Sequence, residues 1–374
     1  MRLFHRAGIV LALAVAACGK DSPSPVDFND PAAVSSNLSA VDSAFDSDVF
    51  RSFTFATLSI EVAAPQPGIQ QATTLLETLR AKLQRTGAHI FLPNLLRARK
   101  LQALMPNLSI SAAEGRIIPD TMYGRVFEWN ETSHQYEYMG TDVTNLNGVR
   151  FVLYALGLDG DVFEPVTAIG TLDIIDQSTP SLLQLHVLVK NSAGTTTYVD
   201  YTASFQAGDN SASATVSGEI TNGLSGGNNK TLSFDQTLTA NAGGVRITAT
   251  FALNNPAITL MLNESLTFDD TNLIISADFR VIQNGETVRT VARITSNQLS
   301  GDFTVNITVY VDGHPVASLN GDPSDPATQW VDAGGEPLTL EDLAALDDLF
   351  AAFESFDAAV FGLFVPIGVL TGQQ

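Results

Sequence analysis

The chain holds a single cysteine, Cys18, among its 374 residues, so it has no pair of thiols for a disulfide and no thiolate metal cluster. Basic residues are also scarce: 19 lysines and arginines stand against 40 aspartates and glutamates, and the formal net charge is −21. Such an acidic surface repels nucleic acid, which needs a basic patch on its partner. After the first 17 residues no apolar run reaches the roughly 20 residues of a membrane-spanning helix. The sequence therefore excludes disulfide scaffolds, nucleic-acid-binding proteins and helical membrane proteins with several spans.

The first 18 residues have the layout of an export signal. Arg2 and Arg6 form a short basic segment, and residues 7–17 are all apolar or glycine. This run is too short to span a bilayer, and it ends in small residues, the last of them Ala17, directly before Cys18. The order predicts a signal peptide over residues 1–17. An ordinary secretory signal followed by an incidental buried cysteine is the alternative.

The segment Val15-Ala16-Ala17-Cys18 resembles the lipobox of bacterial lipoproteins, and the resemblance covers residues 1–18 only. It implies that the Cys18 thiol receives a diacylglyceryl group, that the chain is cut before Cys18, and that the new amine is acylated, for instance with palmitate. Two or more acyl chains hold a protein stably on a bilayer, whereas one holds it marginally. The resemblance thus implies a lipid-anchored protein of the bacterial cell envelope. Gly19, rather than aspartate, follows the cysteine, which favours the outer membrane if sorting follows the pattern of enteric bacteria.

The next two segments differ in composition. Residues 18–29 include GKDSPSP, which lacks periodicity and is rich in helix and strand breakers, so we expect a flexible lipidated tether. Residues 30–106 predict a helical region, because apolar side chains recur at three- and four-residue spacing in 38–49, 70–83 and 93–104. The densest basic cluster of the chain, Arg97, Arg99 and Lys100, is interpreted as a solvated helix face.

Residues 115–320 alternate between apolar and polar side chains, the period of a half-buried strand. The clearest cases are 183–189, 245–253, 273–281 and 303–311. Tight-turn pairs such as Asn284-Gly285 and Asp312-Gly313, and the run 242–244, separate these segments. Short turns between alternating strands indicate antiparallel neighbours. The pattern predicts a large antiparallel β-meander with one wet face, either a sandwich, a barrel or a curved half-barrel.

Residues 338–374 predict a cover for the apolar face of this sheet. Thr339 precedes Glu341 and Asp342, as at the start of a helix. A broad apolar stripe follows, made of Leu343, Leu346, Leu349, Phe350, Phe353, Phe356 and Val360. An apolar tail, FGLFVPIGVL (361–370), ends the chain, and the proline- and glycine-rich connection 320–337 is interpreted as a hinge or lid. The fold class is therefore α+β, with N- and C-terminal helices covering one large sheet.

No catalytic signature in the sequence is convincing. Gly223-Leu224-Ser225-Gly226-Gly227 matches G-x-S-x-G, but strand-like segments flank it at 215–220 and 232–238, whereas a nucleophile elbow joins a strand to a helix. Short acidic loops at Asp159-Gly160-Asp161 with Glu164, and at Asp322 with Asp325, lack the spacing of a calcium loop and are interpreted as turns. The sequence contains no HExxH pattern. No catalytic residue, cofactor or metal site is predicted, and an enzyme is not expected.

Two function hypotheses remain from the sequence. In the first, the envelope lipoprotein is a binding module or carrier that holds an apolar ligand on the covered face of its sheet. In the second, it is a structural or interaction lipoprotein that presents an acidic β-rich surface to an envelope protein partner, with no small-molecule ligand. In both, the membrane is reached through the lipid on Cys18, the one site residue that the sequence identifies.

Overall fold

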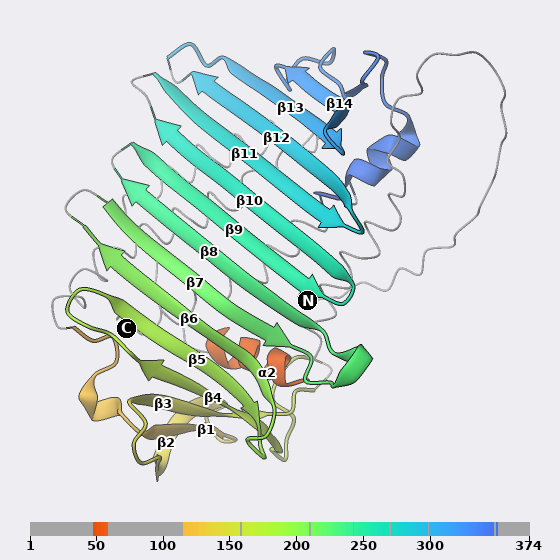
Figure 1. The fold of residues 1–374 in the computed structure, drawn as a ribbon. Helices are drawn as coiled ribbons and strands as arrows, with labels where there is room; N and C mark the ends of the chain where they lie inside the picture. Colours follow the sequence, from red (N-terminus) through yellow and green to blue (C-terminus); the bar gives the residue numbers. More distant parts are fainter. Residues whose placement is uncertain are drawn as a thin grey trace.

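A single open sheet of fifteen strands dominates the computed structural model, which describes residues 48–58 and 115–350 apart from positions 158, 209, 210, 242, 269, 270, 298 and 348 (Figure 1). The strands are β1 (Arg125–Asn130), β2 (Gln135–Asp142), β3 (Gly148–Tyr154), β4 (Ala168–Asp176), β5 (Leu183–Asn191), β6 (Thr197–Ala207), β7 (Ser211–Thr221), β8 (Thr231–Asn241), β9 (Gly244–Asn254), β10 (Ala257–Phe268), β11 (Asn272–Gln283), β12 (Glu286–Asn297), β13 (Phe303–Val311), β14 (His314–Gly321) and β15 (Val331–Asp332). The antiparallel sheet predicted from the sequence is confirmed.

Sequential hairpins build the sheet from β3 to β15, each strand pairing antiparallel with the next. The predicted turns lie where the sequence puts them. Asn284 and Gly285 join β11 to β12, with φ angles of 50° and 87°, and Asp312 and Gly313 join β13 to β14 with 49° and 83°. Two residues in the left-handed region match the right-handed twist of the flanking strands. These turns fix the register of the meander.

The first three strands depart from the predicted meander. β1 pairs antiparallel with β2, but it also pairs parallel with β3, so the order at this end is β3-β1-β2 and β2 forms the edge. β2 is mostly exposed and carries no alternating apolar side. A strand without an apolar face gains little from a position between two neighbours, because it has no side chains to bury there. The sheet is accordingly mixed at this one junction.

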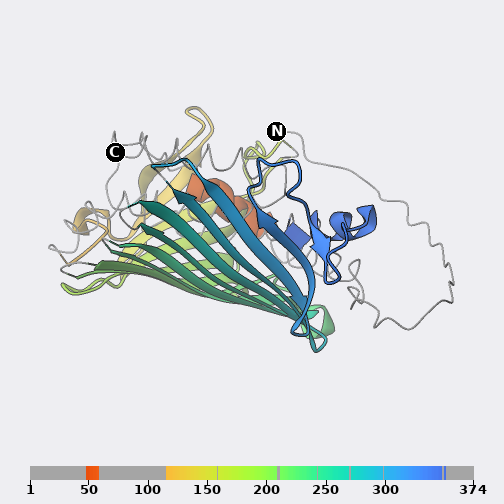
Figure 2. The same ribbon diagram turned by 90° about the horizontal axis from the view of Figure 1, so that it is seen from above.

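The sheet is curved and is not closed into a barrel (Figure 2). Helix α2 (Asp48–Leu58) lies inside the curve and contacts β3 to β6. Its Phe53 and Ala56 are buried, and the Ser52 hydroxyl accepts a hydrogen bond from the backbone N–H of Tyr154 at 3.1 Å. The apolar side of the sheet is therefore the inner side of the curve at this end. Of the predicted helical region 30–106, only this helix falls within the described residues; the segments 70–83 and 93–104 lie outside them.

The predicted C-terminal helix begins as expected. Residues 340–347 and 349–350 are helical. The Thr339 hydroxyl accepts a hydrogen bond from the Asp342 N–H, and the Asp342 carboxylate accepts one from the Thr339 N–H, each at 3.2 Å. This reciprocal pair satisfies two donors at the helix start. Leu346 and Leu349 are buried in the main core. The rest of the stripe and the tail 361–370 lie outside the described residues.

The connection 320–337 is attached to the sheet, which differs from the predicted hinge or lid. Within it β15 pairs with β14, and Trp330, directly before β15, is only 7% exposed. An indole is a large apolar group whose burial stabilises its segment. This packing holds the connection against the last strands of the sheet.

Candidate functional site

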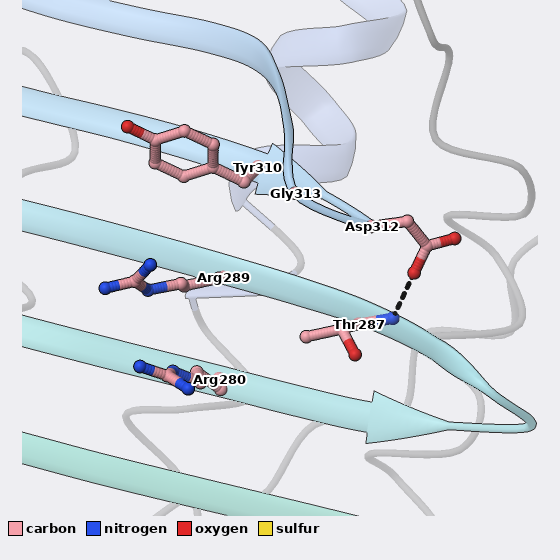
Figure 3. Close-up of a pocket in the computed structure, with 6 residues that line it drawn as sticks. All are labelled: Arg280, Thr287, Arg289, Tyr310, Asp312 and Gly313. Carbon is pink, nitrogen blue, oxygen red and sulfur yellow. Dashed lines mark hydrogen bonds between the residues drawn. The ribbon is translucent and has the colours of Figure 1, made fainter.

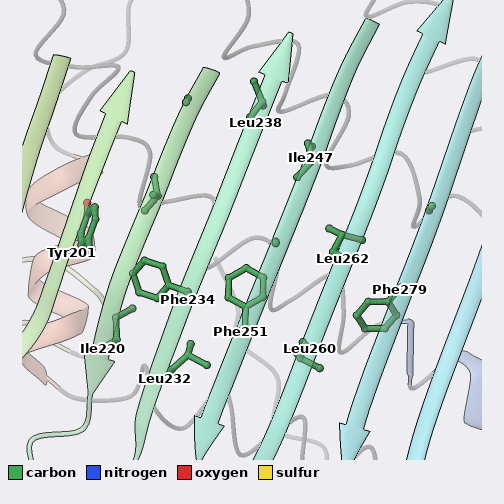
Figure 4. Packing of buried hydrophobic residues seen from close by; sticks show 14 of the residues in the cluster. Tyr201, Ile220, Leu232, Phe234, Leu238, Ile247, Phe251, Leu260, Leu262 and Phe279 are labelled. Carbon is green, nitrogen blue, oxygen red and sulfur yellow. The ribbon is translucent and has the colours of Figure 1, made fainter. Parts of the chain in front are cut away.

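The inner face of the sheet is a continuous apolar surface. Alternate residues of the strands from β3 to β14 point to this side, and nearly all are buried, as Figure 4 shows for the central strands. Gly218 on β7 lies between Tyr201 on β6 and Phe234 on β8 in the pairing register, and the centres of those two rings are 6.0 Å apart. A Cβ at position 218 would come within 2.4 Å of the Tyr201 Cβ. The missing side chain gives the two rings room to approach.

Buried polar side chains interrupt this apolar surface, and three of them lie in the interior of central strands. Gln236 on β8 is 4% exposed, Glu264 on β10 is 0% exposed and Thr290 on β12 is 0% exposed. Neither Gln236 Oε1 nor Thr290 Oγ1 has a hydrogen-bond partner among the described residues. A buried polar atom left without a partner lowers the stability of the folded protein by about 1–3 kcal/mol. A core with a purely structural role would be more stable with apolar residues at these positions.

The strand register places two of these groups on one line across the sheet. Gln236 pairs with Ala249, and the line continues through Leu262 and Phe279 to Thr290. With neighbouring strands about 4.8 Å apart, the two polar ends of the line are roughly 19 Å apart. Glu264 lies on β10, between them, on the adjacent line. The inner face thus offers polar positions on alternate strands, separated by apolar side chains.

The outer face is polar and carries two hollows formed by described residues. One hollow of about 490 Å³ is lined by Arg280, Thr287, Arg289, Tyr310, Asp312 and Gly313 (Figure 3). A second, of about 260 Å³, lies over β8 to β11 and also includes Arg280. The register again aligns their lining residues: Asp235, Thr250, Met261, Arg280, Arg289 and Tyr310 form one line across six strands.

An ion-pair cluster stands at the centre of this outer line. Arg280 and Arg289 are directly opposite each other on β11 and β12, and both bind Asp278. Each donates from Nε and Nη2 to the two carboxylate oxygens, over 2.8–3.1 Å. Hydrogen bonds from Arg289, and then those from Arg280, lower the pKa of Asp278 to about 2, against the opposing effect of burial. The Arg289 guanidinium also lies over the Tyr310 ring, 6.0 Å from its centre.

The site residue predicted from the sequence, Cys18, lies outside the described residues. The G-x-S-x-G segment is described, and it forms the loop between β7 and β8 with a short 3-10 helix at Gly226–Asn228. Leu224 is 58% exposed there. Strands flank the loop on both sides, as predicted, so the geometry of a nucleophile elbow does not arise.

The carboxylates of the acidic loops have protein partners: Glu164 accepts a hydrogen bond from the Trp129 indole N–H at 3.3 Å, and three aspartates accept bonds within their own loops. Asp159 accepts a hydrogen bond from the Asp161 N–H, Asp322 from the Ser324 N–H and Asp325 from the Ala327 N–H. Such bonds two residues along the chain are typical of turns. In the part of the chain that the structure describes, no group of three or more histidine, cysteine, aspartate or glutamate side chains could hold a metal ion. Nor does that part contain a helix long and apolar enough to cross a bilayer.

Both candidate sites leave traces in the sequence. The two-residue turn Asn284-Gly285 pairs Gln283 with Glu286, and counting outward sets Arg280 opposite Arg289. On the inner face, Gln236 and Thr290 each occupy a position where the alternation requires an apolar residue.

Comparisons with protein-family models, curated proteins and solved structures find no match for this chain.

Proposed function

We propose that this chain is a lipid-anchored protein of the bacterial cell envelope, on the outer membrane, that carries an amphiphile on the inner face of its open sheet. The ligand is a mostly apolar molecule, such as a lipid or fatty acid, with at least one polar group. The anchor rests on the lipobox-like sequence at Cys18, and the carrier function rests on the sheet.

One observation carries the carrier function: buried polar atoms that have no hydrogen-bond partner among the described residues lie within an apolar surface. Gln236 Oε1 and Thr290 Oγ1 are each held in the core of the protein at a cost in stability. A ligand whose polar group binds one of them removes that cost, and its acyl part replaces contacts between apolar side chains. An amphiphile meets both requirements, whereas a wholly apolar or wholly polar ligand meets one.

Thermal unfolding with added palmitate tests this proposal. A ligand that binds only the folded state stabilises it by about 2.7 kcal/mol at a hundredfold excess over Kd. We therefore expect palmitate to raise the melting temperature, and acetate, which has the carboxylate alone, to leave it unchanged. The double variant Gln236→Leu/Thr290→Val removes both polar atoms and should reduce the upward shift. Thr308→Val, on the outer face of β13, is the matched control and should keep it. If neither palmitate nor a lysophospholipid raises the melting temperature of the wild-type protein, the proposal is contradicted.

The anchor has a separate test. Mass spectrometry of the mature N-terminus should find residue 18 as the first residue, carrying acyl groups, and a Cys18→Ala variant should leave the membrane fraction. An unmodified Cys18 or another cleavage position contradicts the anchor without touching the carrier function.

The alternative, an interaction lipoprotein without a small ligand, has its own support in the outer face. This face is polar and rich in threonine and serine, and it includes exposed charged side chains from β7 to β12. Crosslinking in cells followed by purification distinguishes the two functions, because the alternative requires an envelope protein joined to the outer face and no bound amphiphile.

A further inference from the structure

The arginine pair on the outer face has more positive charge than its partner can balance. Like charges directly opposite each other on neighbouring strands destabilise a sheet, yet Arg280 and Arg289 occupy such a pair. Among the described residues Asp278 is the carboxylate that binds them, and with a pKa lowered to about 2 it is ionised at neutral pH. Two guanidiniums and one carboxylate leave one net positive charge in this cluster, in a chain whose formal net charge is −21.

The guanidiniums also retain hydrogen-bond donors. A guanidinium has five N–H groups, and each of these two uses Nε and Nη2 toward Asp278. The Nη1 groups have no hydrogen-bond partner among the described residues. Both side chains are about two-fifths exposed, at 41% for Arg280 and 40% for Arg289. Unused donors on two neighbouring arginines match the geometry of an oxyanion, which accepts two parallel N–H bonds from each planar fork.

The surroundings form a hollow of the right size for a small ligand. Its volume of about 490 Å³ falls in the range of small-molecule sites. In Figure 3 the two guanidiniums and the Tyr310 ring lie at the same end, while the Asp312 carboxylate turns to the Thr287 N–H, 2.8 Å away, at the other end. The Asp312 carboxylate is thus bonded to the backbone of β12, and the arginine end is the cationic end of the hollow.

We infer that Arg280 and Arg289 form a binding site for the oxyanion of a small ligand, a carboxylate or phosphate group, held in the hollow beside Tyr310. The second hollow adjoins at Arg280, and its lining includes Thr248, Thr250 and Asn263 together with the carboxylates of Asp235 and Asp278. These side chains form hydrogen bonds with hydroxyl groups, so an anionic sugar fits the two hollows together better than a bare anion does. This site is on the opposite face from the proposed amphiphile site, and each stands without the other.

Calorimetric titration of the full chain at low ionic strength tests the site with three probes: inorganic phosphate, glucuronate and neutral glucose. We expect saturable binding of both anions, with Kd near or below about 1 mM, equivalent to about 4 kcal/mol, and no binding of glucose. If glucuronate binds with a Kd tenfold lower than that of phosphate, the ligand occupies both hollows. If the two Kd values are equal, it occupies the arginine end alone. The absence of saturable binding for both anions at about ten times that concentration overturns the inference.

Variants distinguish a specific binding site from general electrostatic attraction. Arg289→Gln should weaken anion binding at least tenfold, and Arg289→Lys, which keeps the charge but loses the planar fork, should also weaken it. Arg293→Gln is the matched control, because Arg293 is exposed on the same face of the same strand, four residues along. Circular dichroism checks that each variant is folded. Equal weakening by Arg293→Gln and Arg289→Gln overturns the site.

Discussion

Replacing Thr290 with valine should stabilise the ligand-free protein, although most core substitutions destabilise. Thr290 is 0% exposed, and its hydroxyl has no partner among the described residues. On either side it pairs with Phe279 and Val309, both buried. An unsatisfied buried hydroxyl costs about 1–3 kcal/mol. Valine has nearly the same shape and equal preference for a strand, so the expected gain is about 1–2 kcal/mol.

Urea unfolding of protein refolded without lipid measures this gain. The midpoint should rise while the slope stays constant, because the surface exposed on unfolding does not change. Thr308→Val, on the outer face, should alter the stability by less than about 0.5 kcal/mol. A Thr290→Val variant less stable than the wild type would refute the reasoning, since it would mean that the hydroxyl makes a favourable hydrogen bond in the ligand-free protein.

Three further predictions concern the rest of the fold. Asp278→Asn should lower the free energy of unfolding by about 1 kcal/mol at pH 7, a value reduced for the exposure of the two arginine partners. The folded pKa of Asp278, about 2, lies below the ordinary value of 3.8, so this contribution to stability is present at neutral pH. Urea unfolding should show that it falls by about half at pH 3. Gly218→Ala should lower the stability by about 2 kcal/mol, because its Cβ would meet the Asp200 carbonyl oxygen at 2.3 Å, and an unchanged urea midpoint would contradict the packing. Thr339→Ala removes the helix cap shared with Asp342, should cost about 1 kcal/mol locally, and should speed hydrogen exchange at 340–347.

The strands of the meander were predictable because each carries its own pattern. The segment 303–311 alternates strictly, and it forms β13 over those same residues. Two-residue turns then determine which residues face each other, which is how Asn284-Gly285 sets the arginine pair. The parallel contact between β1 and β3 was not predictable in this way. It depends on where a whole hairpin docks, and no local pattern records that choice.

The candidate sites were harder to predict than the fold for a related reason. A polar residue in an apolar register, such as Gln236, reads from the sequence as a minor irregularity. It becomes informative only when the structure shows that the side chain is buried and that Oε1 has no partner in the described part of the chain. Burial and hydrogen bonding are properties of several strands together, and the sequence of one strand does not contain them.

The most direct test of the carrier function is to locate the bound amphiphile. A palmitate analogue with a photoreactive group on its acyl chain, activated after binding to the full chain, should form adducts with inner-face residues of the central strands, such as Leu262 on β10. Peptide mapping by mass spectrometry should find them in 232–240, 258–266 and 288–294, and excess palmitate should suppress them. Adducts confined to outer-face residues, or labelling that palmitate does not reduce, would contradict the account.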